Sequence, residues 1–366
     1  MKLLITSVGS LLGQNILDSI ESRRGQIEVC GMNTISENAR NFRCDTNYLV
    51  HNTLSPEFEK DFKRIIEKEQ PDFILPGRDA DCVFLTDFKE KHPREFVNKI
   101  PFGSSVIPKM MFDKHQSFLF CQKYGLPFAD SFFYKNKADK AGLDDFVEKH
   151  TFPLLTKPRE GFGSLGVQFI LNREQLIKAT QNEEIFFQEY LGNPNDILKY
   201  EDFFNSGIPL FFQIPENNQY AAQTIISPDG SIGEVFFVKA SMMHGRAEES
   251  RQIHNKEVEE LVHRFAKAFY ANGWYGPANF QLKQDRKGQW KVFELNPRLT
   301  GTSSGRTLMG FDEFGMLCDI FIPELNISNL TKKEKVQGTL IKYLTDYLLL
   351  DEDVEQLKTN KVWKKS

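Results

Sequence analysis

The chain has 366 residues, of which 40% are hydrophobic and 26% charged, and its formal net charge at pH 7 is -4. Such a length usually divides into two or three domains, and such a composition is typical of a globular protein. The slightly acidic balance gives no reason to expect nucleic acid as a partner, and no apolar run approaches the roughly 18 residues that a membrane span needs. The five cysteines are scattered singly, which favours reduced thiols in a cytoplasmic protein without a structural zinc site.

Short apolar runs alternate with helical patterns in residues 1–111. The runs are 3–8, 27–32 and 73–75. This alternation predicts a parallel sheet with flanking helices, as in a Rossmann-like domain. The fingerprint of a dinucleotide site is incomplete, because only Gly9 and Gly13 are present and the second run ends at Asn33 instead of an acid. We therefore expect a Rossmann-like fold that does not bind NAD. The alternative is a dehydrogenase that uses this domain, and quenching of NADH fluorescence would test it.

A glycine-rich segment follows an apolar strand that ends in Lys157. Gly161, Gly163 and Gly166 spell G-x-G-x-x-G, but they open a strand and not a helix, which argues against a dinucleotide loop. A Walker loop places its lysine after the glycines, and the H-R-D and D-F-G motifs of protein kinases do not occur. The pattern predicts a flexible hairpin whose backbone amides, with Ser164, can cover phosphates. An ordinary exposed hairpin is the alternative.

The next apolar strand ends in Gln188, Glu189, Tyr190 and Leu191. Its main chain can present one donor and one acceptor to an adenine ring, with the last two side chains as apolar walls. A buried strand followed by a turn is the alternative interpretation. The segment 193–218 is polar and irregular and indicates no function.

Later segments predict two hairpins and one long helix. The hairpins are 220–227 with 232–239 and 278–283 with 290–296, the helix is 256–270, and 242–251 reads as a polar loop. In the last strand Glu294 and Asn296 project to one face, while Phe293 and Leu295 enter a core. Pairing around the turn places Gln281 near Val292, on the face of Glu294 and Asn296. Three oxygen-bearing side chains then converge as a candidate site for a hard cation.

These motifs resemble those of the ATP-grasp superfamily. They are Lys157 with its glycine hairpin, Gln188-Glu189-Tyr190-Leu191 and Phe293-Glu294-Leu295-Asn296-Pro297-Arg298. The chain looks most like one ATP-grasp unit of the carbamoyl-phosphate synthase large subunit, which shares the E-x-N-P-R stretch and the glutamine at the position of Gln281. The resemblance covers roughly residues 1–320. It implies an α/β and α+β protein: a Rossmann-like pre-ATP-grasp domain (1–111), a small subdomain with the glycine hairpin (112–185), a large subdomain with the metal site (186–325) and a C-terminal tail (326–366), read as a solvated, partly helical terminus.

The resemblance also implies roles for individual residues. Lys114 and Lys157 would contact ATP phosphates, the loop formed by Gly161, Gly163, Ser164 and Gly166 would cover them, and Gln188, Glu189, Tyr190 and Leu191 would line adenine. Gln219 stands where many members have a glutamate for the ribose, and His244 and Arg246 are candidates on a loop facing the nucleotide. Glu294 would bridge two Mg2+ ions, Gln281 and Asn296 would each bind one, and Arg298, with Lys157, would act on the transferring phosphoryl group.

The implied activity is that of an ATP-dependent carboxylate ligase, which forms an acyl phosphate and joins a small carboxylate to an amine or related nucleophile. The alternative is a non-catalytic or regulatory ATP-binding protein. The expected partners are small molecules, with no nucleic acid and no membrane, and the resemblance is compatible with a homodimer. The loop 78–81 and the tail carry no pattern that identifies a substrate.

Overall fold

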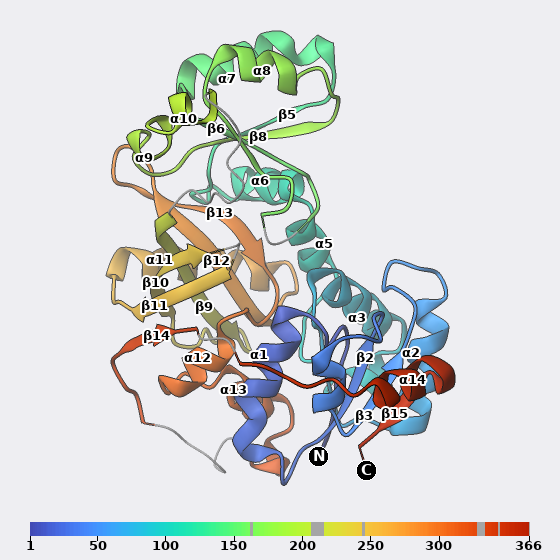
Figure 1. Cartoon of the computed structure of the whole chain (residues 1–366). Helices are drawn as coiled ribbons and strands as arrows, with labels where there is room; N and C mark the ends of the chain where they lie inside the picture. The colour runs from blue at the N-terminus through green and yellow to red at the C-terminus, as the bar shows by residue number, and fades with distance from the viewer. Residues whose placement is uncertain (162–163, 206–215, 244–245, 328–333, 343–344, 366) are drawn as a thin grey trace.

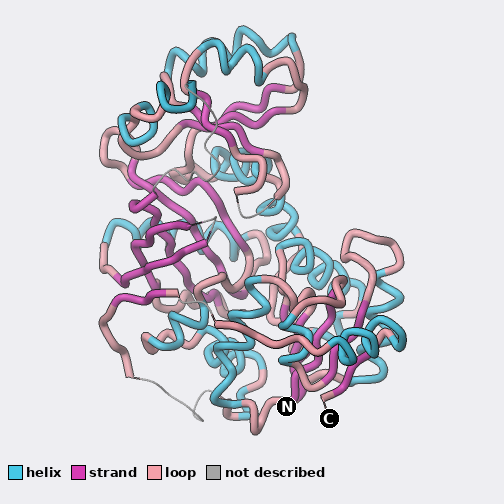
Figure 2. The backbone as a smooth tube through the Cα atoms, viewed as in Figure 1, coloured by secondary structure: helices cyan, strands magenta, loops and turns pink. Residues whose placement is uncertain are grey.

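Three sheets organise the computed structural model (Figure 1), which describes residues 1–161, 164–205, 216–243, 246–327, 334–342 and 345–365. Within these residues the sheets have five, six and four strands. Figure 2 shows that strands form the middle of each part and that helices flank them. Among the described residues, no helix is both long and apolar enough to cross a membrane.

The first sheet confirms the Rossmann-like expectation. Its parallel strands are β1 (Lys2–Ile5), β2 (Glu28–Asn33), β3 (Thr46–Leu49) and β4 (Phe73–Leu75), in the order β3-β2-β1-β4. The helices are α1 (Leu11–Ile20), η1 (Glu21–Arg23), η2 (Ala39–Arg43), α2 (Phe58–Glu69), α3 (Asp79–Lys91) and α4 (Pro93–Phe96). Ser10 caps α1, and a Cβ at Gly13 would lie 2.2 Å from the Val8 carbonyl oxygen. Gly13 therefore allows α1 to start close to the loop after β1.

The C-terminal segment is part of the fold, which corrects its interpretation as a solvated terminus. Strand β14 (Thr339–Ile341) pairs with β11 of the six-stranded sheet, and after α14 (Asp351–Asn360) strand β15 (Val362–Lys364) pairs antiparallel with β3. Trp363 is buried with its ring 5.1 Å from that of Phe42. The chain end thus adds one edge strand to each of two sheets.

The small subdomain is built on the four-stranded sheet, in the order β5-β8-β6-β7. Its elements are α5 (Val106–Phe112), α6 (Lys114–Lys123), β5 (Ser131–Tyr134), η3 (Lys137–Asp139), α7 (Lys140–His150), β6 (Leu154–Lys157), β7 (Gln168–Ile170), α8 (Arg173–Ala179), β8 (Ile185–Glu189), α9 (Asn195–Leu198) and α10 (Glu201–Asn205). Strand β8 pairs with both β5 and β6, so a boundary at residue 185 cuts this sheet and the division lies beyond Glu189.

The six-stranded sheet has the order β13-β12-β9-β10-β11-β14. Its elements are β9 (Glu216–Ile226), β10 (Phe236–Met243), β11 (Arg246–Gln252), α11 (Lys256–Ala271), β12 (Gly276–Gln284), β13 (Trp290–Asn296), α12 (Ser303–Leu308), α13 (Glu313–Phe321) and η4 (Pro323–Leu325). Both predicted hairpins are confirmed. Within the supposed polar loop 242–251, residues 242–243 and 246–251 instead belong to the paired strands β10 and β11.

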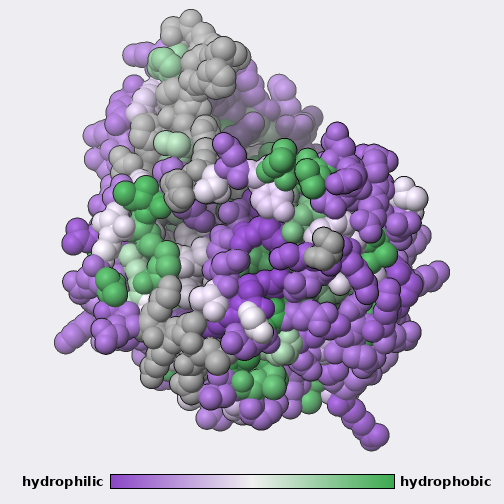
Figure 3. Space-filling view, turned by 60° about the horizontal axis from the view of Figure 1, so that its bottom comes forward, coloured by the Kyte–Doolittle hydropathy of each residue, from purple (hydrophilic) through white to green (hydrophobic). Residues whose placement is uncertain are grey.

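The two faces of this sheet differ. Helix α11 covers one face, where Phe265 and Phe269 pack against Phe280 with ring centroids 5.5 and 5.9 Å apart. On the other face, Met309 and Phe311, which follow α12, pack with Phe236 and Val238 of β10. The surface of the whole molecule, seen with the bottom of Figure 1 turned forward, is mostly hydrophilic with small separate hydrophobic patches (Figure 3).

A buried ion pair joins α12 to α13. Arg306 Nη1 lies 3.6 Å from Glu313 Oε1, and both side chains are 1% exposed. Replacing Arg306 with methionine would leave the carboxylate buried without a cation. We expect Arg306→Met to lower the free energy of unfolding by about 3–5 kcal/mol, measured by chemical denaturation. The double variant Arg306→Met/Glu313→Leu should recover most of that loss, and equal losses in both variants would contradict a coupled pair.

Candidate active site

Lys157 lies where the four-stranded and six-stranded sheets face each other. It ends β6, is buried, and donates a 2.6 Å hydrogen bond from Nζ to Oε1 of Gln188. Its Nζ is also 4.9 Å from the centre of the Phe293 ring on β13. Gln188 in turn donates from Nε2 to the Ser131 hydroxyl, 3.1 Å away. The ammonium group is therefore held in one position by neighbours from both sheets.

A second buried lysine lies near Lys157. Lys283, on β12, has its Nζ 5.8 Å from the Tyr190 ring centre. The pKa of Lys283 is lowered to about 8, mainly by burial. The positive charge of Lys157 also lowers this pKa, and the negative charge of Asp196 raises it. Burial likewise lowers the pKa of Lys157 to about 8, with Glu294 raising it and Lys114 lowering it. Two desolvated ammonium groups that repel each other are suited to a polyanionic ligand.

The glycine hairpin is confirmed between β6 and β7, which pair antiparallel. Gly161 and Gly166 have φ angles of 139° and 76°, and Ser164 one of 59°. A Cβ at Gly166 would lie 2.9 Å from Pro158 Cγ, so glycine suits this position in both backbone angle and space. Gly163 lies outside the described residues.

Lys114 is attached to the base of this hairpin. Its backbone N–H donates to the Arg159 carbonyl oxygen at 2.9 Å, and its Nζ donates to that of Gly161 at 3.3 Å. Asp113 caps the start of α6 and forms an ion pair with Arg159. These contacts place the Lys114 ammonium beside the loop that the sequence predicts to cover phosphates.

The end of β8, predicted to line adenine, contains a paired residue, Glu189, followed by two residues outside the sheet ladder, Tyr190 and Leu191. Glu189 accepts hydrogen bonds from Lys291 Nζ and the Asp130 N–H, both at 2.7 Å, so its carboxylate ties strands together and only its main chain remains a candidate for the base. Pairing of β8 ends at Glu189, which leaves the backbone of Tyr190 and Leu191 outside the ladder. Both side chains are buried and suited to be apolar walls.

The candidate metal residues converge on one face of the six-stranded sheet. Gln281 Nε2 is 3.2 Å and Asn296 Nδ2 is 3.4 Å from Glu294 Oε1. Gln219, predicted near the ribose, lies within β9 and donates to Gln281 Oε1 at 3.0 Å. It therefore extends this polar row instead of standing apart from it.

The register of the last hairpin differs from the expected one. Gln281 pairs with Glu294 and not with Val292, because the register shifts between Gln281 and Leu282. Phe293 is the extra residue of this bulge. It does not enter the core as predicted but lies half-buried beneath the Lys157 ammonium. The bulge therefore supplies a contact to the small subdomain.

Arg298 is positioned by the first domain. Its Nε is 2.8 Å from Asp79 Oδ1, at the start of α3, and its Nη2 donates to Asn296 Oδ1 at 3.2 Å. Asp79 thus directs the guanidinium toward the metal row. Residues 79–81, expected in a loop, form the first turn of α3, and this contact joins them to the candidate active site.

The donor set of this row suits a hard cation. Glu294 has no ion-pair partner in the described parts of the chain, although Lys157 and Arg298 are near enough to act on it electrostatically. No group of three or more His, Cys, Asp or Glu side chains that could hold a metal occurs in those parts. One carboxylate and two side-chain amides remain, and their oxygens are ligands that Mg2+ accepts.

The two remaining predicted residues are His244 and Arg246. His244 lies outside the described residues. Arg246 begins β11, with its Nε 3.7 Å from Glu248 Oε2. The sequence did not predict a role in this site for three residues: Lys283, Asp79 and Phe293. Only Lys283 had a usable signal, because it follows Gln281 by two positions on one strand.

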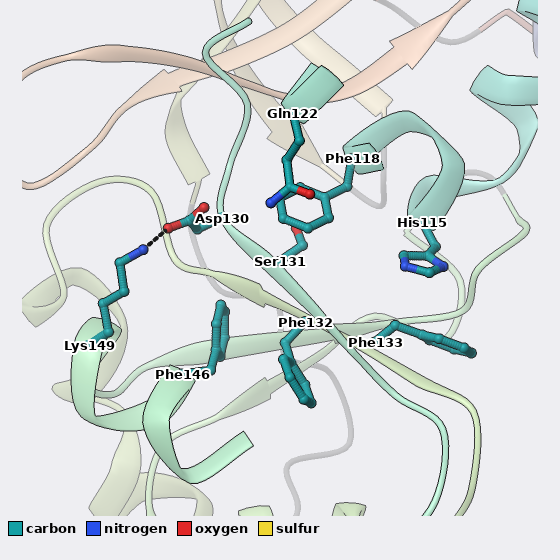
Figure 4. A pocket seen from close by; sticks show the side chains of 9 residues that line it. All are labelled: His115, Phe118, Gln122, Asp130, Ser131, Phe132, Phe133, Phe146 and Lys149. Atoms are coloured by element: carbon teal, nitrogen blue, oxygen red, sulfur yellow. Dashed lines mark hydrogen bonds and ion pairs between the residues drawn. The ribbon is translucent and has the colours of Figure 1, made fainter. Parts of the chain in front are cut away.

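The pocket in Figure 4 lies elsewhere in the small subdomain. Its volume is about 420 Å³, and its lining comes from α6, β5 and α7 with adjoining residues: His115, Phe118, Gln122, Asp130, Ser131, Phe132, Phe133, Phe146 and Lys149. None of the predicted site residues lines it. Asp130 and Lys149 form an ion pair of 2.5 Å at its rim.

No protein-family model matches the sequence, and no curated protein sequence matches it. Several solved structures share its fold. N5-carboxyaminoimidazole synthetase from Staphylococcus aureus, complexed with ADP, has a TM-score of 0.62 and 13% identity over 98% of this chain and 95% of that chain. L-amino acid ligase from Bacillus licheniformis has a TM-score of 0.59 and 16% identity, over 91% of this chain and 75% of that chain. The biotin carboxylase domain of Hydrogenobacter thermophilus 2-oxoglutarate carboxylase is a dimer in complex with MgADP, ADP and bicarbonate. It has a TM-score of 0.62 and 13% identity, over 87% of this chain and 69% of that chain.

These structures are ATP-grasp enzymes, and the chain has the ATP-grasp fold. At 13–16% identity the likeness concerns the fold. The part that matches extends beyond the paired sheets of the candidate site to the Rossmann-like domain, since 87–98% of the chain is covered.

Proposed function

We propose that the protein is an ATP-dependent carboxylate ligase that forms an acyl phosphate and joins a small carboxylate to an amine. The observation that carries this proposal is the meeting of the metal row, centred on Glu294, with the buried Lys157 from the opposite sheet. A fold that only binds nucleotide has no need of a half-buried carboxylate that lacks an ion-pair partner among the described residues. The fold shared with a solved amino acid ligase, a synthetase and a biotin carboxylase domain supports the same reaction type.

The proposed chemistry begins with attack of a substrate carboxylate oxygen on the γ-phosphorus of ATP. A new O–P bond forms, the bond to the β-phosphate oxygen breaks, and ADP leaves. An amine then attacks the carbonyl carbon, the bond from this carbon to the phosphate oxygen breaks, inorganic phosphate leaves with the bonding electrons, and the nitrogen loses a proton to solvent. This sequence replaces a poor leaving group, the carboxylate oxygen, with a good one.

Each residue of the site has a defined task in this scheme. Lys157 and Lys114 neutralise phosphate oxygens, and Arg298, held by Asp79, faces the phosphoryl group in transfer or the acyl phosphate. Glu294, Gln281 and Asn296 would hold Mg2+, with two ions in the full proposal, and the metal would supply positive charge beside the transferring phosphoryl group. The hairpin that contains Gly161 and Gly166 would exclude water from the acyl phosphate.

Calorimetric titration with a non-hydrolysable ATP analogue tests the binding step. We expect one nucleotide per chain with Mg2+ present and weaker binding after chelation. Lys157→Met should weaken binding at least tenfold, whereas Lys149→Met, at the separate pocket, should leave it unchanged. Absence of nucleotide binding in the wild-type protein would contradict the proposal. The motif likeness to a carbamoyl-phosphate synthase unit remains a proposal. A homodimer is also proposed; the dimer of the Hydrogenobacter domain supports it, and light scattering would test it.

A further inference from the structure

The chain enters the four-stranded sheet at β5 and leaves it after β8, and both connections contact β13 of the six-stranded sheet. Before β5, the Ala129 N–H donates to the Val292 carbonyl oxygen at 2.7 Å, and the Val292 N–H donates to that of Pro127 at 3.0 Å. At the end of β8, the Glu189 N–H donates to the Asp130 carbonyl oxygen at 2.9 Å. The two connections are therefore bound to each other as well as to β13.

The Glu189 carboxylate joins these connections to the six-stranded sheet. Its Oε1 accepts hydrogen bonds from the Asp130 N–H and from Lys291 Nζ on β13, both at 2.7 Å. Lys291 Nζ is also 3.4 Å from Asp285 Oδ2 in the β12–β13 turn. The side chain of Glu189 is 10% exposed and that of Lys291 21%, so water screens their ion pair only in part. Removing one partner leaves the other as a poorly compensated charge.

His150, the last residue of α7, contacts the other oxygen of this carboxylate. Its Nδ1 is 3.4 Å from Glu189 Oε2, and its Nε2 is 3.1 Å from Asp130 Oδ2. Burial raises the pKa of Glu189, but His150 and Lys291 outweigh burial and lower it. Burial lowers the pKa of His150, but the two carboxylates outweigh burial and raise it. Both oxygens of Glu189 are thus held by groups from other elements.

A second side chain of the β12–β13 turn contacts the small subdomain. Arg286 donates from Nη1 to the Thr151 hydroxyl and from Nη2 to the Phe152 carbonyl oxygen, the latter at 3.3 Å. Thr151 and Phe152 directly follow α7. The end of α7, the end of β8 and the β12–β13 hairpin are therefore joined by side chains at one place.

Strand alternation separates this network from the side chains predicted to contact phosphates. Gln188, which accepts the hydrogen bond of Lys157, is the neighbour of Glu189 on β8, so the two side chains project to opposite faces of the sheet. The Glu189 carboxylate can therefore act on a nucleotide only through the main chain. Tyr190 and Leu191, whose backbone lies outside the ladder, follow it directly. The network thus fixes the start of the segment predicted to meet adenine against β13, the strand that carries Glu294 and Asn296.

We propose that Glu189 and Lys291 are positioning residues that give the nucleotide site its preference for adenine. This inference rests on the proposed function and deepens it, because the ion pair fixes the base-binding main chain relative to the metal row that the triphosphate must reach. Adenine presents an amino donor at C6 and an acceptor at N1, whereas guanine presents an oxygen acceptor and an N–H donor there. A rigid main-chain donor and acceptor therefore fit only one of the two bases, since the other leaves both groups unpaired.

Non-hydrolysable analogues of ATP and GTP are the probes, titrated calorimetrically into the full chain with Mg2+. We expect the wild-type protein to bind the ATP analogue at least about tenfold more tightly than the GTP analogue. Lys291→Met should lower the affinity for the ATP analogue about tenfold and that for the GTP analogue by less than about twofold. Lys291→Arg keeps the charge and should keep most of the preference. Lys287→Met, an exposed lysine on the same turn, is the matched control and should bind as the wild type does.

A loss of equal size for both analogues in Lys291→Met would show a merely structural role and overturn the proposal. A wild-type protein that binds both analogues equally would also overturn it while leaving the proposed function intact. Melting temperatures check that the variants fold. If Lys291→Met does not fold, Glu189→Gln replaces it, because its amide oxygen can still accept from the Asp130 N–H, and the same narrowing of the preference is expected. Absence of binding of either analogue to the wild-type protein would overturn both this inference and the proposed function.

Discussion

Glu294→Ala should abolish ATP turnover while leaving the chain folded. The carboxylate is the centre of the metal row, and without it the two amides of Gln281 and Asn296 cannot bind Mg2+ firmly. We expect ADP release to fall by at least about a thousandfold, since removal of one strong electrostatic contributor costs on the order of 10²–10³ and here the metal is lost with it.

The fold should tolerate this change. Glu294 is half-buried and accepts two hydrogen bonds from neutral amides, so the free energy of unfolding should change by about 1 kcal/mol. Glu249→Ala, an exposed glutamate on β11, is the control and should retain full turnover. Substrate-dependent ADP release from Glu294→Ala at a wild-type rate would remove the metal assignment.

Nucleotide affinity should fall as the pH rises through 8. Lys157 and Lys283 have pKa values lowered to about 8, so both are mostly protonated at pH 7 and mostly neutral at pH 9. Phosphate binds the protonated form and raises its pKa, so affinity is nearly constant below pH 7 and drops above pH 8. Each lysine contributes up to about tenfold per pH unit, and the pair up to about a hundredfold.

Calorimetry across pH 6.5 to about 9.5 would measure this dependence. The groups that act on the two lysines are Glu294, Lys114 and Asp196, together with the lysines themselves. Lys283→Met should lower the steepness by about one proton and Lys157→Met should do the same. A wild-type affinity that stays constant up to pH 9 would show that neither ammonium contacts the nucleotide.

Local patterns predicted much of the fold and part of the site. Alternation of strands and helices was enough for the parallel sheet, and a lysine before three glycines was enough for the β6–β7 hairpin, because both depend on neighbours in the sequence. The polar face of β13 also follows from strand alternation. The bulge at Phe293 does not, since a register shift depends on the partner strand.

Long-range contacts explain the remaining differences. Asp79 and Arg298 are 219 positions apart, and no periodic pattern connects them. Strands β14 and β15 have three residues each, too few to show alternation, and only pairing with β11 and β3 defines them. Residues 242–243 and 246–251 belong to paired strands although they are mostly polar, and this polarity resembled that of a loop.

The central claim is that this site transfers phosphate from ATP to a carboxylate. Its most direct test is a screen of amino acids and other small carboxylates with ATP, Mg2+ and hydroxylamine, in which ADP and hydroxamate are measured together. We predict that at least one carboxylate gives equal amounts of both, that none forms without Mg2+, and that Glu294→Ala forms neither. A protein that binds ATP but releases no ADP with any carboxylate, phosphorylated ones included, would contradict the account and leave a nucleotide-binding protein without ligase activity.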